Sequence, residues 1–479
     1  MILEGGTVLT GDPRLPRARA VAVGGARIAG GVDVREGDLS MVSSERVQLD
    51  GRCVTPGFHD AHVHFLEWAL SREETDLSAA TTPAEVYESL RSAARPWVRA
   101  HSLRDDLAAL LDPLELDAAC AGRPCIVSTH DRHTVVATAA SGEPSGLLRE
   151  HEAFARWEAA PLPGEAELDA AIRTGVREAH RRGLTGVHDF QRSDGFAAWQ
   201  RIAADGALAF RVWASLPVER LDDALGLGLR TGFGDEFLRV GPIKAFADGT
   251  LGSRTASMLE PFSDGGHGMR LLEPDELRDI VARASRGGLD VAVHAIGDRA
   301  NRDVLDALES TRAIWQPAGL RPRIEHAQLL HPDDLHRFAS LGVTASMQPS
   351  HRTADLRVAE RAWGDHRLRG GYAFATLQED GAPLCFGSDA PIEDLAPLAG
   401  VRDAVEGGLR VEAALEGFWL GAARARHAER TLGRLVPGAL ADLVVLDRDP
   451  TSCPVEELDR IEVVATMVGG RWVHGAPPW

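Results

Sequence analysis

Residues 54–64 of the chain read VTPGFHDAHVH. The near-continuous apolar run over Val54–Asp60 is typical of a strand that is buried on both faces, as in a parallel sheet. Successive side chains of a strand point to opposite faces, so His62 and His64 are expected to point the same way. Two imidazoles placed like this can bind one metal ion, although the pattern is common by chance. The stretch therefore predicts a buried strand with two candidate metal ligands at its end.

Seven more buried strands are predicted downstream, and helix-like stretches such as Glu165–Arg182 and Pro274–Arg286 lie between most of them. These strands are Thr185–Phe190, Phe210–Leu216, Val240–Phe246, Leu289–His294, Arg323–His326, Val343–Met347 and Leu384–Ser388. Eight units of a strand followed by a helix predict an α/β protein with a (β/α)8 TIM barrel. In such a barrel the active site lies at the carboxyl ends of the strands.

Two regions do not fit a bare barrel. The segment between the first two strands, roughly residues 65–182, is far longer than an ordinary crossover. It predicts an inserted lobe over about residues 66–165, at the mouth of the site. Residues 1–55 and 432–479 are rich in short β-like runs, and we expect both ends of the chain to build one small β-sandwich. The barrel would then span residues 56–431.

Composition narrows the class of protein. The 479 residues carry a formal net charge of −19, which disfavours nucleic acid and anionic membrane surfaces as partners. The sequence contains no apolar run of the ~20 residues that span a bilayer and no signal-peptide pattern. The five cysteines are scattered and form no CxxC pair. We expect a cytoplasmic protein that acts on a small molecule, and a homo-oligomer is compatible with the sequence.

Further candidate ligands stand at the ends of other predicted strands. His294 ends the fifth strand, His326 ends the sixth, and Asp389 follows the eighth. Taken singly, such a histidine is more often a core residue, and such an aspartate is more often a helix cap. Together with His62 and His64 they predict a site for one or two divalent metals. Zinc is the expected metal, because imidazole and carboxylate ligands suit it.

Lys244, in the fourth strand, is the single lysine beside 51 arginines. A buried lysine is costly unless it is neutralised or paired, and an ion pair with Asp248 would account for it. A neutral lysine amine can also react with carbon dioxide to give a carbamate, whereas a guanidinium stays protonated. The surviving lysine is therefore a candidate bridging ligand.

Seven segments, in this order, resemble those of a known family: Pro56–His64 (PGFHDAHVH), Lys244–Ala256 (KAFADGTLGSRTA), His294–Asp298 (HAIGD), Ile324–Gln328 (IEHAQ), Met347–His351 (MQPSH), Phe386–Pro391 (FGSDAP) and Pro437–Val444 (PGALADLV). The sequence is similar to the amidohydrolase superfamily, in particular to the amidohydrolase-3 branch that includes N-substituted formamide deformylase. His59 departs from the family pattern, which usually has an aliphatic residue there. The stretch between Pro391 and Leu415 also looks shorter than is typical.

The resemblance implies a role for each matched residue. His62 and His64 would bind one metal, His294 and His326 the second, and a Lys244 carbamate would bridge them. Asp389 would bind metal and relay protons. Among other polar residues, His351 and Arg254 could polarise or orient a substrate carbonyl, or they could equally form a core ion pair or lie in a solvated loop. Asp131 and His133 resemble a segment of the lobe that reaches the substrate pocket, and a surface turn fits them equally well.

The expected function is metal-dependent hydrolysis of a non-peptide amide bond, such as that of an N-formyl or N-acyl amine. A deaminase of the same fold is disfavoured, because Gly297 stands where that class has glutamate. Hydrolysis of an ester or of another C–N bond remains an alternative. A non-catalytic barrel that only binds its ligand is another, although this chain keeps the whole set of ligands.

Overall fold

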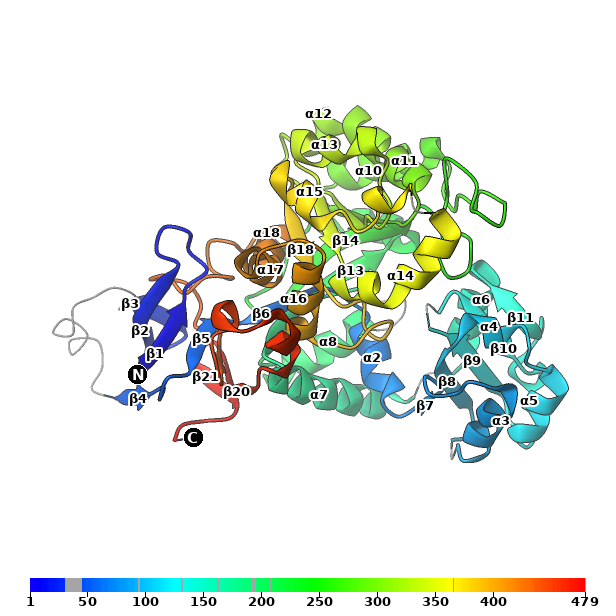
Figure 1. Ribbon diagram of the computed structural model, residues 1–479, viewed down its shortest axis with the longest axis horizontal. Helices are drawn as coiled ribbons and strands as arrows, with labels where there is room; N and C mark the ends of the chain where they lie inside the picture. Colours follow the sequence, from blue (N-terminus) through cyan, green and yellow to red (C-terminus); the bar gives the residue numbers. More distant parts are fainter. Residues whose placement is uncertain are drawn as a thin grey trace.

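Eight parallel strands form the centre of the molecule (Figure 1). The computed structural model describes residues 1–30, 45–93, 95–130, 132–161, 163–190, 195–206, 208–364 and 366–478. The barrel strands are β6 (Phe58–Val63), β12 (Leu184–Asp189), β13 (Arg211–Pro217), β14 (Leu238–Phe246), β15 (Val291–Ala295), β16 (Arg323–His326), β17 (Thr344–Met347) and β18 (Leu384–Phe386). They pair in sequence order, and a bridge between Val63 and Ala390 joins the first strand to the segment after the last. The predicted (β/α)8 barrel is confirmed.

Helices surround this barrel and bury its outer face. They are α2 (Phe65–Ser71), α7 (Glu165–Arg181), α8 (Gly195–Ala204), α9 (Leu221–Gly226), α10 (Pro274–Arg286), α11 (Asp298–Ser310), α12 (Arg312–Trp315), α13 (Pro332–Leu341), α14 (Pro349–Trp363), α15 (Phe374–Glu379), α16 (Pro397–Glu406), α17 (Val411–Glu416) and α18 (Ala422–Ala425). None of the helices in the described part of the chain is long and apolar enough to cross a bilayer.

The apolar run that opens the barrel is divided between two sheets. Its first half is β5 (Cys53–Pro56), which pairs with strands from both ends of the chain. Its second half is β6, the first barrel strand. Gly57 lies between them, where a Cβ atom would stand 2.3 Å from the Thr185 side chain, so only glycine fits. The barrel strand therefore starts later than predicted and continues to Val63, which places His62 within it.

The two ends of the chain meet in one hydrogen-bonded sheet beside the barrel (Figure 1). Its strands are β1 (Ile2–Leu9), β2 (Arg17–Gly24), β3 (Arg27–Gly30), β4 (Arg46–Gln48), β5, β19 (Leu443–Leu446), β20 (Val463–Val468) and β21 (Arg471–His474). They follow the order β21-β20-β19-β5-β1-β2-β3, with β4 paired to β1. The strand pairing joins both ends of the chain in one continuous sheet with a shared apolar core.

The long segment after β6 forms a lobe with its own five-stranded sheet, on the other side of the barrel from the terminal sheet (Figure 1). The strands are β7 (Thr75–Asp76), β8 (Val98–Leu103), β9 (Cys125–Thr129), β10 (Thr134–Ala137) and β11 (Gly146–Arg149), and the helices are α3 (Pro83–Arg91), α4 (Asp105–Ala108), α5 (Pro113–Ala119) and α6 (His151–Ala159). Helix α2 lies before this sheet and packs on α7, with Phe65 and Trp68 in the main barrel core. The lobe's own fold thus begins near Thr75.

Candidate metal centre

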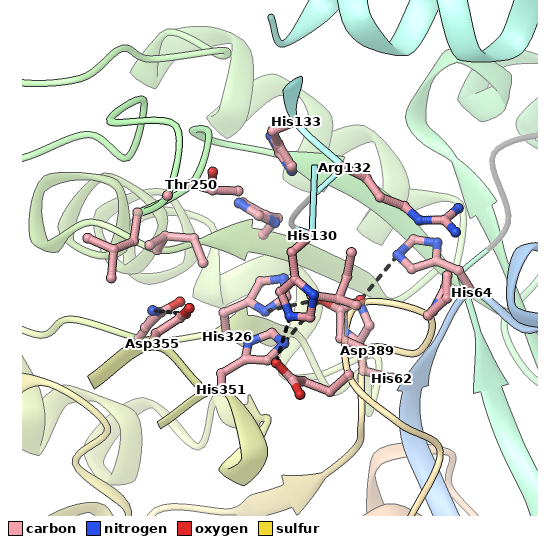
Figure 2. Close-up of a pocket in the computed structure, with 18 of the residues that line it drawn as sticks. His62, His64, His130, Arg132, His133, Thr250, His326, His351, Asp355 and Asp389 are labelled. Atoms are coloured by element: carbon pink, nitrogen blue, oxygen red, sulfur yellow. Dashed lines mark hydrogen bonds and ion pairs between the residues drawn. The ribbon is translucent and has the colours of Figure 1, made fainter. Parts of the chain in front are cut away.

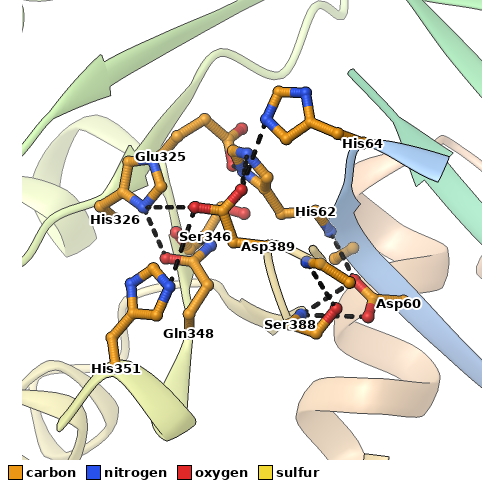
Figure 3. Close-up of polar contacts among 12 residues, drawn as sticks. Asp60, His62, His64, Glu325, His326, Ser346, Gln348, His351, Ser388 and Asp389 are labelled. Atoms are coloured by element: carbon orange, nitrogen blue, oxygen red, sulfur yellow. Dashed lines mark hydrogen bonds and ion pairs between the residues drawn. The ribbon is translucent and has the colours of Figure 1, made fainter. Parts of the chain in front are cut away.

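Four histidines surround the carboxylate of Asp389 at the carboxyl ends of the barrel strands (Figure 3). Its Oδ1 atom lies 3.3 Å from Nε2 of His62 and 3.4 Å from Nε2 of His64. Its Oδ2 atom lies 3.9 Å from Nδ1 of His326 and 3.7 Å from Nε2 of His351. Each carboxylate oxygen therefore faces its own pair of imidazoles.

The candidate ligand atoms form two groups that share Asp389. One group is His62, His64 and Asp389, and the other is His326, His351 and Asp389. Within each group the nitrogen and oxygen atoms lie within 4.8 Å of one another, and all five side chains are buried. The spacing and the donor set are those of sites for divalent metal ions.

The ring of His62 is held by a chain of charged groups. Its Nδ1 atom lies 2.6 Å from Oε2 of Glu325, which in turn accepts hydrogen bonds from Arg323. A carboxylate beside Nδ1 accepts a hydrogen bond from the Nδ1–H group. This fixes the tautomer in which the free lone pair is on Nε2, the nitrogen that faces Asp389. Carboxylate–histidine pairs of this kind orient metal ligands in many proteins.

The ring of His326 is held in a similar way by an amide. Its Nδ1 atom lies 2.8 Å from Oε1 of Gln348, the residue that precedes α14. His326 has a φ angle of 72° and Asp389 one of 60°. Residues other than glycine rarely adopt this left-handed backbone region. The Asp389 backbone is fixed by a 2.7 Å hydrogen bond from its N–H to the carbonyl of His62. Such strain is typical of functional sites.

The electrostatics favour ligands in the protonation state that metals need. Burial, together with the positive charge of Lys244, lowers the pKa of His62 to about 4. Burial also holds the pKa values of His294 and His326 well below the ordinary value. Burial alone would raise the pKa of Asp389, but the neighbouring histidines hold it well below its usual range. At neutral pH the site thus offers neutral imidazoles at His62, His294 and His326 and an ionised carboxylate at Asp389.

Some buried imidazole nitrogen atoms at this site make no hydrogen bond to the described residues. Nε2 of His62 and Nε2 of His351 are enclosed by protein and make no hydrogen bond to the described residues. Such atoms are costly unless something binds them. The donor set, its burial and its neutral imidazoles together fit a divalent metal.

His294 and Lys244 line the same cavity in a different setting. Nε2 of His294 lies 3.1 Å from the carbonyl oxygen of Gly249, and its ring centre lies 4.5 Å from that of His326. The Nζ atom of Lys244, which is 5% exposed, lies 4.7 Å from the ring centre of Phe190 and 4.8 Å from that of Phe246. Among the described side chains, the partner that completes the second ligand group with His326 is His351 rather than His294.

Three buried aspartates hold the loops that carry these residues. Asp60 accepts hydrogen bonds from the backbone N–H groups of His62 and Ser388, and burial raises its pKa to about 7. Asp248 accepts from the backbone N–H groups of Ser257, Ile296 and Gly297, and burial raises its pKa to about 8. Asp189 accepts from the N–H of Phe65. Asp248 therefore holds the backbone of the loops that follow β14 and β15.

A cavity of about 90 Å³ lies over the site, and the lobe supplies part of its wall (Figure 2). His133 lines it, together with His130 and Arg132. Asp131 lies outside the described residues. Arg254 is not among the lining residues: its guanidinium donates to Asp264 at 3.1 Å and to the carbonyl of Leu251.

Polar contacts between described residues join the lobe to the barrel mouth at this cavity. Nε2 of His130 lies 3.0 Å from Oε1 of Glu393, and the Arg132 guanidinium donates to Glu67 at 3.2 Å. Neither pair was found from the sequence, and neither was the support of His62 by Glu325 or of His326 by Gln348. Glu325 and Gln348 stand inside recognised segments, next to His326 and near His351, and this proximity was the available signal.

Known proteins share this architecture over nearly the whole chain. The model of the amidohydrolase family matches residues 45–474. Protein LONG AFTER FAR-RED 3 of Arabidopsis thaliana is 28% identical, over 99% of this chain and 91% of its own. The N-substituted formamide deformylase of Arthrobacter pascens is 25% identical, over 98% of this chain and 97% of its own.

A solved structure agrees with these matches. The crystal structure of an uncharacterized metal-dependent hydrolase from Pyrococcus horikoshii OT3 superposes with a TM-score of 0.82 at 28% identity, covering 95% of this chain and 99% of that one. The agreement extends over barrel, lobe and terminal sheet. With the family match from residue 45 to residue 474, it shows that the chain is a hydrolase that belongs to the amidohydrolase family.

Proposed function

We propose that the protein hydrolyses a non-peptide amide bond in a small molecule, such as an N-formyl or N-acyl amine, at a centre of one or two divalent metals. The observation that carries the proposal is the placement of Asp389 between two pairs of imidazoles. The similarity to an enzyme named N-substituted formamide deformylase supports the choice of bond. Its name describes that enzyme, and here it supplies the first substrates to test.

His62, His64 and Asp389 would hold one metal, and His326 would hold a second with either His351 or His294. A bound divalent metal polarises a carbonyl group and lowers the pKa of a coordinated water to about 7. Zinc is the expected ion, since neutral imidazole and carboxylate suit it. Glu325 and Gln348 keep the rings in place through their hydrogen bonds to Nδ1 of His62 and of His326.

Asp389 is the proton carrier in this proposal. Its low pKa keeps it ionised at neutral pH, so it can accept a proton from the attacking water. The water oxygen bonds to the carbonyl carbon, the C–N bond breaks, and Asp389 passes the proton to the departing nitrogen. The products are a carboxylic acid and an amine, so atoms and charge balance.

Lys244 is proposed to act as a carbamate that bridges the metals. The neutral amine would bond to carbon dioxide and lose a proton, which gives a carboxylate-like group on the lysine. The support is its burial in the wall of the cavity that His62, His294 and His326 also line. This role also accounts for the one position at which the chain uses lysine.

The test combines metal analysis with a hydrolysis screen of purified protein. We expect one to two equivalents of divalent metal, and turnover of N-formyl or N-acyl amines in a screen that also includes cyclic amides and esters. A triple His62→Ala, His64→Ala, His326→Ala variant should lose both metal and turnover. His366→Ala, at a histidine with a 66% exposed side chain, is the control and should keep both.

Each alternative predicts a different result. Ester-only turnover, or ring deamination alone, would move the function to another bond with the same site. Full metal occupancy without turnover of any substrate in the screen would favour a binding protein. Stoichiometric metal in the triple variant would contradict the proposed ligands.

A further inference from the structure

A second cavity, of about 610 Å³, adjoins the metal centre. It shares four lining residues with the first cavity: His64, Phe154, Lys244 and Phe246. We call it the side cavity. The shared residues make the two cavities neighbours at the metal centre, so a molecule bound at the ligands can extend into the side cavity.

Most of the side-cavity wall is apolar. Its apolar residues follow three consecutive barrel strands: Phe190 after β12, Val218 after β13, and Leu271 and Leu272 after β14. The lobe adds Phe154 from α6. Of these side chains only Phe190 is fully buried, and the others stay partly accessible. Partly accessible apolar walls around a cavity favour an apolar ligand.

Charged residues also line the side cavity. Lys244 and His64 are shared with the cavity over the metal centre. His151, Glu219 and Arg220 line it with exposed side chains, and Arg220 also pairs with Asp223. A charged substituent lying along the apolar wall would lose its hydration without a charged partner there, whereas a neutral apolar one would lose nothing.

The volumes of the two cavities indicate which of them can enclose a substrate substituent. Pockets that enclose small organic ligands usually measure about 300–1,000 Å³. The space over the ligands, about 90 Å³, is smaller than this range, and the side cavity falls within it. The scissile amide group therefore fits in the space over the candidate ligands, and its substituent fits in the side cavity.

We infer that the side cavity is the specificity subsite of the enzyme and binds a neutral apolar substituent, arylalkyl or branched alkyl, of the scissile amide. This inference rests on the proposed hydrolysis at the metal centre. It also assigns a function to Phe190, to helix α6 and to the loops after β13 and β14, whose described residues supply no group to the two ligand clusters.

The first test fills the cavity from its exposed side. Ala155 lines the side cavity from α6, and Ala155→Trp would occupy it without cutting into the barrel core. Ala159→Trp is the matched control: the same exposed substitution one helical turn away, at a residue that lines neither cavity. Val218→Trp fills the cavity from a different loop and gives an independent variant.

The readout is a series of N-substituted formamides whose substituent grows from methyl to phenylbutyl. In the wild type and Ala159→Trp, kcat/KM should rise about fourfold per added methylene, the factor that corresponds to burial of one CH2 group. In Ala155→Trp and Val218→Trp this rise should vanish, so that the N-methyl and phenylbutyl compounds have similar kcat/KM values. The same rise in all four proteins would overturn the subsite.

A binding measurement separates this inference from the proposed function. Phenylbutanol, which cannot be hydrolysed, is titrated into the metal-loaded proteins by calorimetry. It should bind to the wild type and to Ala159→Trp, and at least about tenfold more weakly to the two filled variants, in line with the loss of several buried methylenes. If no amide is turned over but this pattern holds, the reaction is wrong and the subsite stands. Equal binding to all four proteins would contradict the subsite, whatever the reaction.

Discussion

The two ends of the barrel both bury histidines, yet they surround them with different groups. At the carboxyl ends of the strands, His62, His64, His326 and His351 face the carboxylate of Asp389 (Figure 3). At the opposite end, His59 lies near two buried arginines. Arg211 pairs with Asp442 at 2.8 Å, and Arg426 lies over the ring of Trp213.

The difference teaches that the position along a strand decides what a buried polar residue does. The carboxyl ends open into a cavity where a metal and a substrate can reach the histidines. The base is closed by the terminal sheet, whose entry residue Asp442 is the partner of Arg211. Changes at the mouth should therefore alter chemistry, and changes at the base should alter the free energy of unfolding.

Lys244→Arg should have the largest effect. A guanidinium cannot form a carbamate and would place a fixed positive charge beside the metal ligands, so metal content and turnover should both be lost. Lys244→Ala should also be inactive but should regain part of its activity in acetate or propionate, whose carboxylate can replace the carbamate. An active arginine variant, or failure of every carboxylate to restore Lys244→Ala, would remove the bridging role.

Asp389→Asn comes next. An amide cannot carry the proton, so kcat should fall by about 10²–10⁴-fold, the usual contribution of a general acid–base group. The midpoint of urea unfolding for the metal-free protein should change little, which separates this variant from those at the base. A variant that keeps kcat within about tenfold of the wild type would reject the role.

Asp442→Ala should act on stability instead. It leaves the buried Arg211 guanidinium without its carboxylate, a change that typically costs about 3–5 kcal/mol of unfolding free energy. Asp264→Ala, which removes the exposed partner of Arg254, is the control and should cost no more than about 1 kcal/mol. Metal content should be unchanged in both. Loss of metal from a fully folded Asp442→Ala variant would contradict the expectation that changes at the base affect only stability.

His59→Leu should produce the smallest effect, visible in pH dependence. Burial lowers the pKa of His59 to about 3, so below pH 6.5 the unfolded chain binds a proton that the folded chain does not. The wild type should therefore lose about 2 kcal/mol from this residue between pH 7 and pH 5, and the variant should not. Urea unfolding of the metal-free proteins at both pH values measures the difference, and identical pH dependence would contradict it.

Much of the barrel could be predicted because its strands are near-continuous apolar runs that end in polar residues. The first strand was misplaced for the same reason: the apolar run crosses Pro56-Gly57 without a break, and only tertiary contacts divide it between two sheets. The single terminal sheet depends on pairing between residues hundreds of positions apart, such as Val54 with Val445, which local patterns do not encode.

The gathering of His62, His64, His326 and Asp389 could be predicted because the barrel brings the carboxyl ends of its strands to one place. The direction of a side chain on a loop could not. Arg254 belongs to a recognised segment, but its φ angle of 59° lies in the left-handed region, and its guanidinium reaches Asp264. The pairing of His326 with His351 depends on how α14 starts after Gln348, which the sequence does not specify.

The lobe has hydrophobic clusters of its own, one of which contains Val86, Leu103 and Val136. It meets the barrel mouth through polar contacts such as His130–Glu393. Such a unit can accumulate substitutions without disturbing the core that aligns the ligands. In the course of evolution, the lobe residues that line the cavity can therefore change while the barrel residues beneath them stay the same. One hydrolytic machine can in this way be adapted to new compounds through the residues of an appendage.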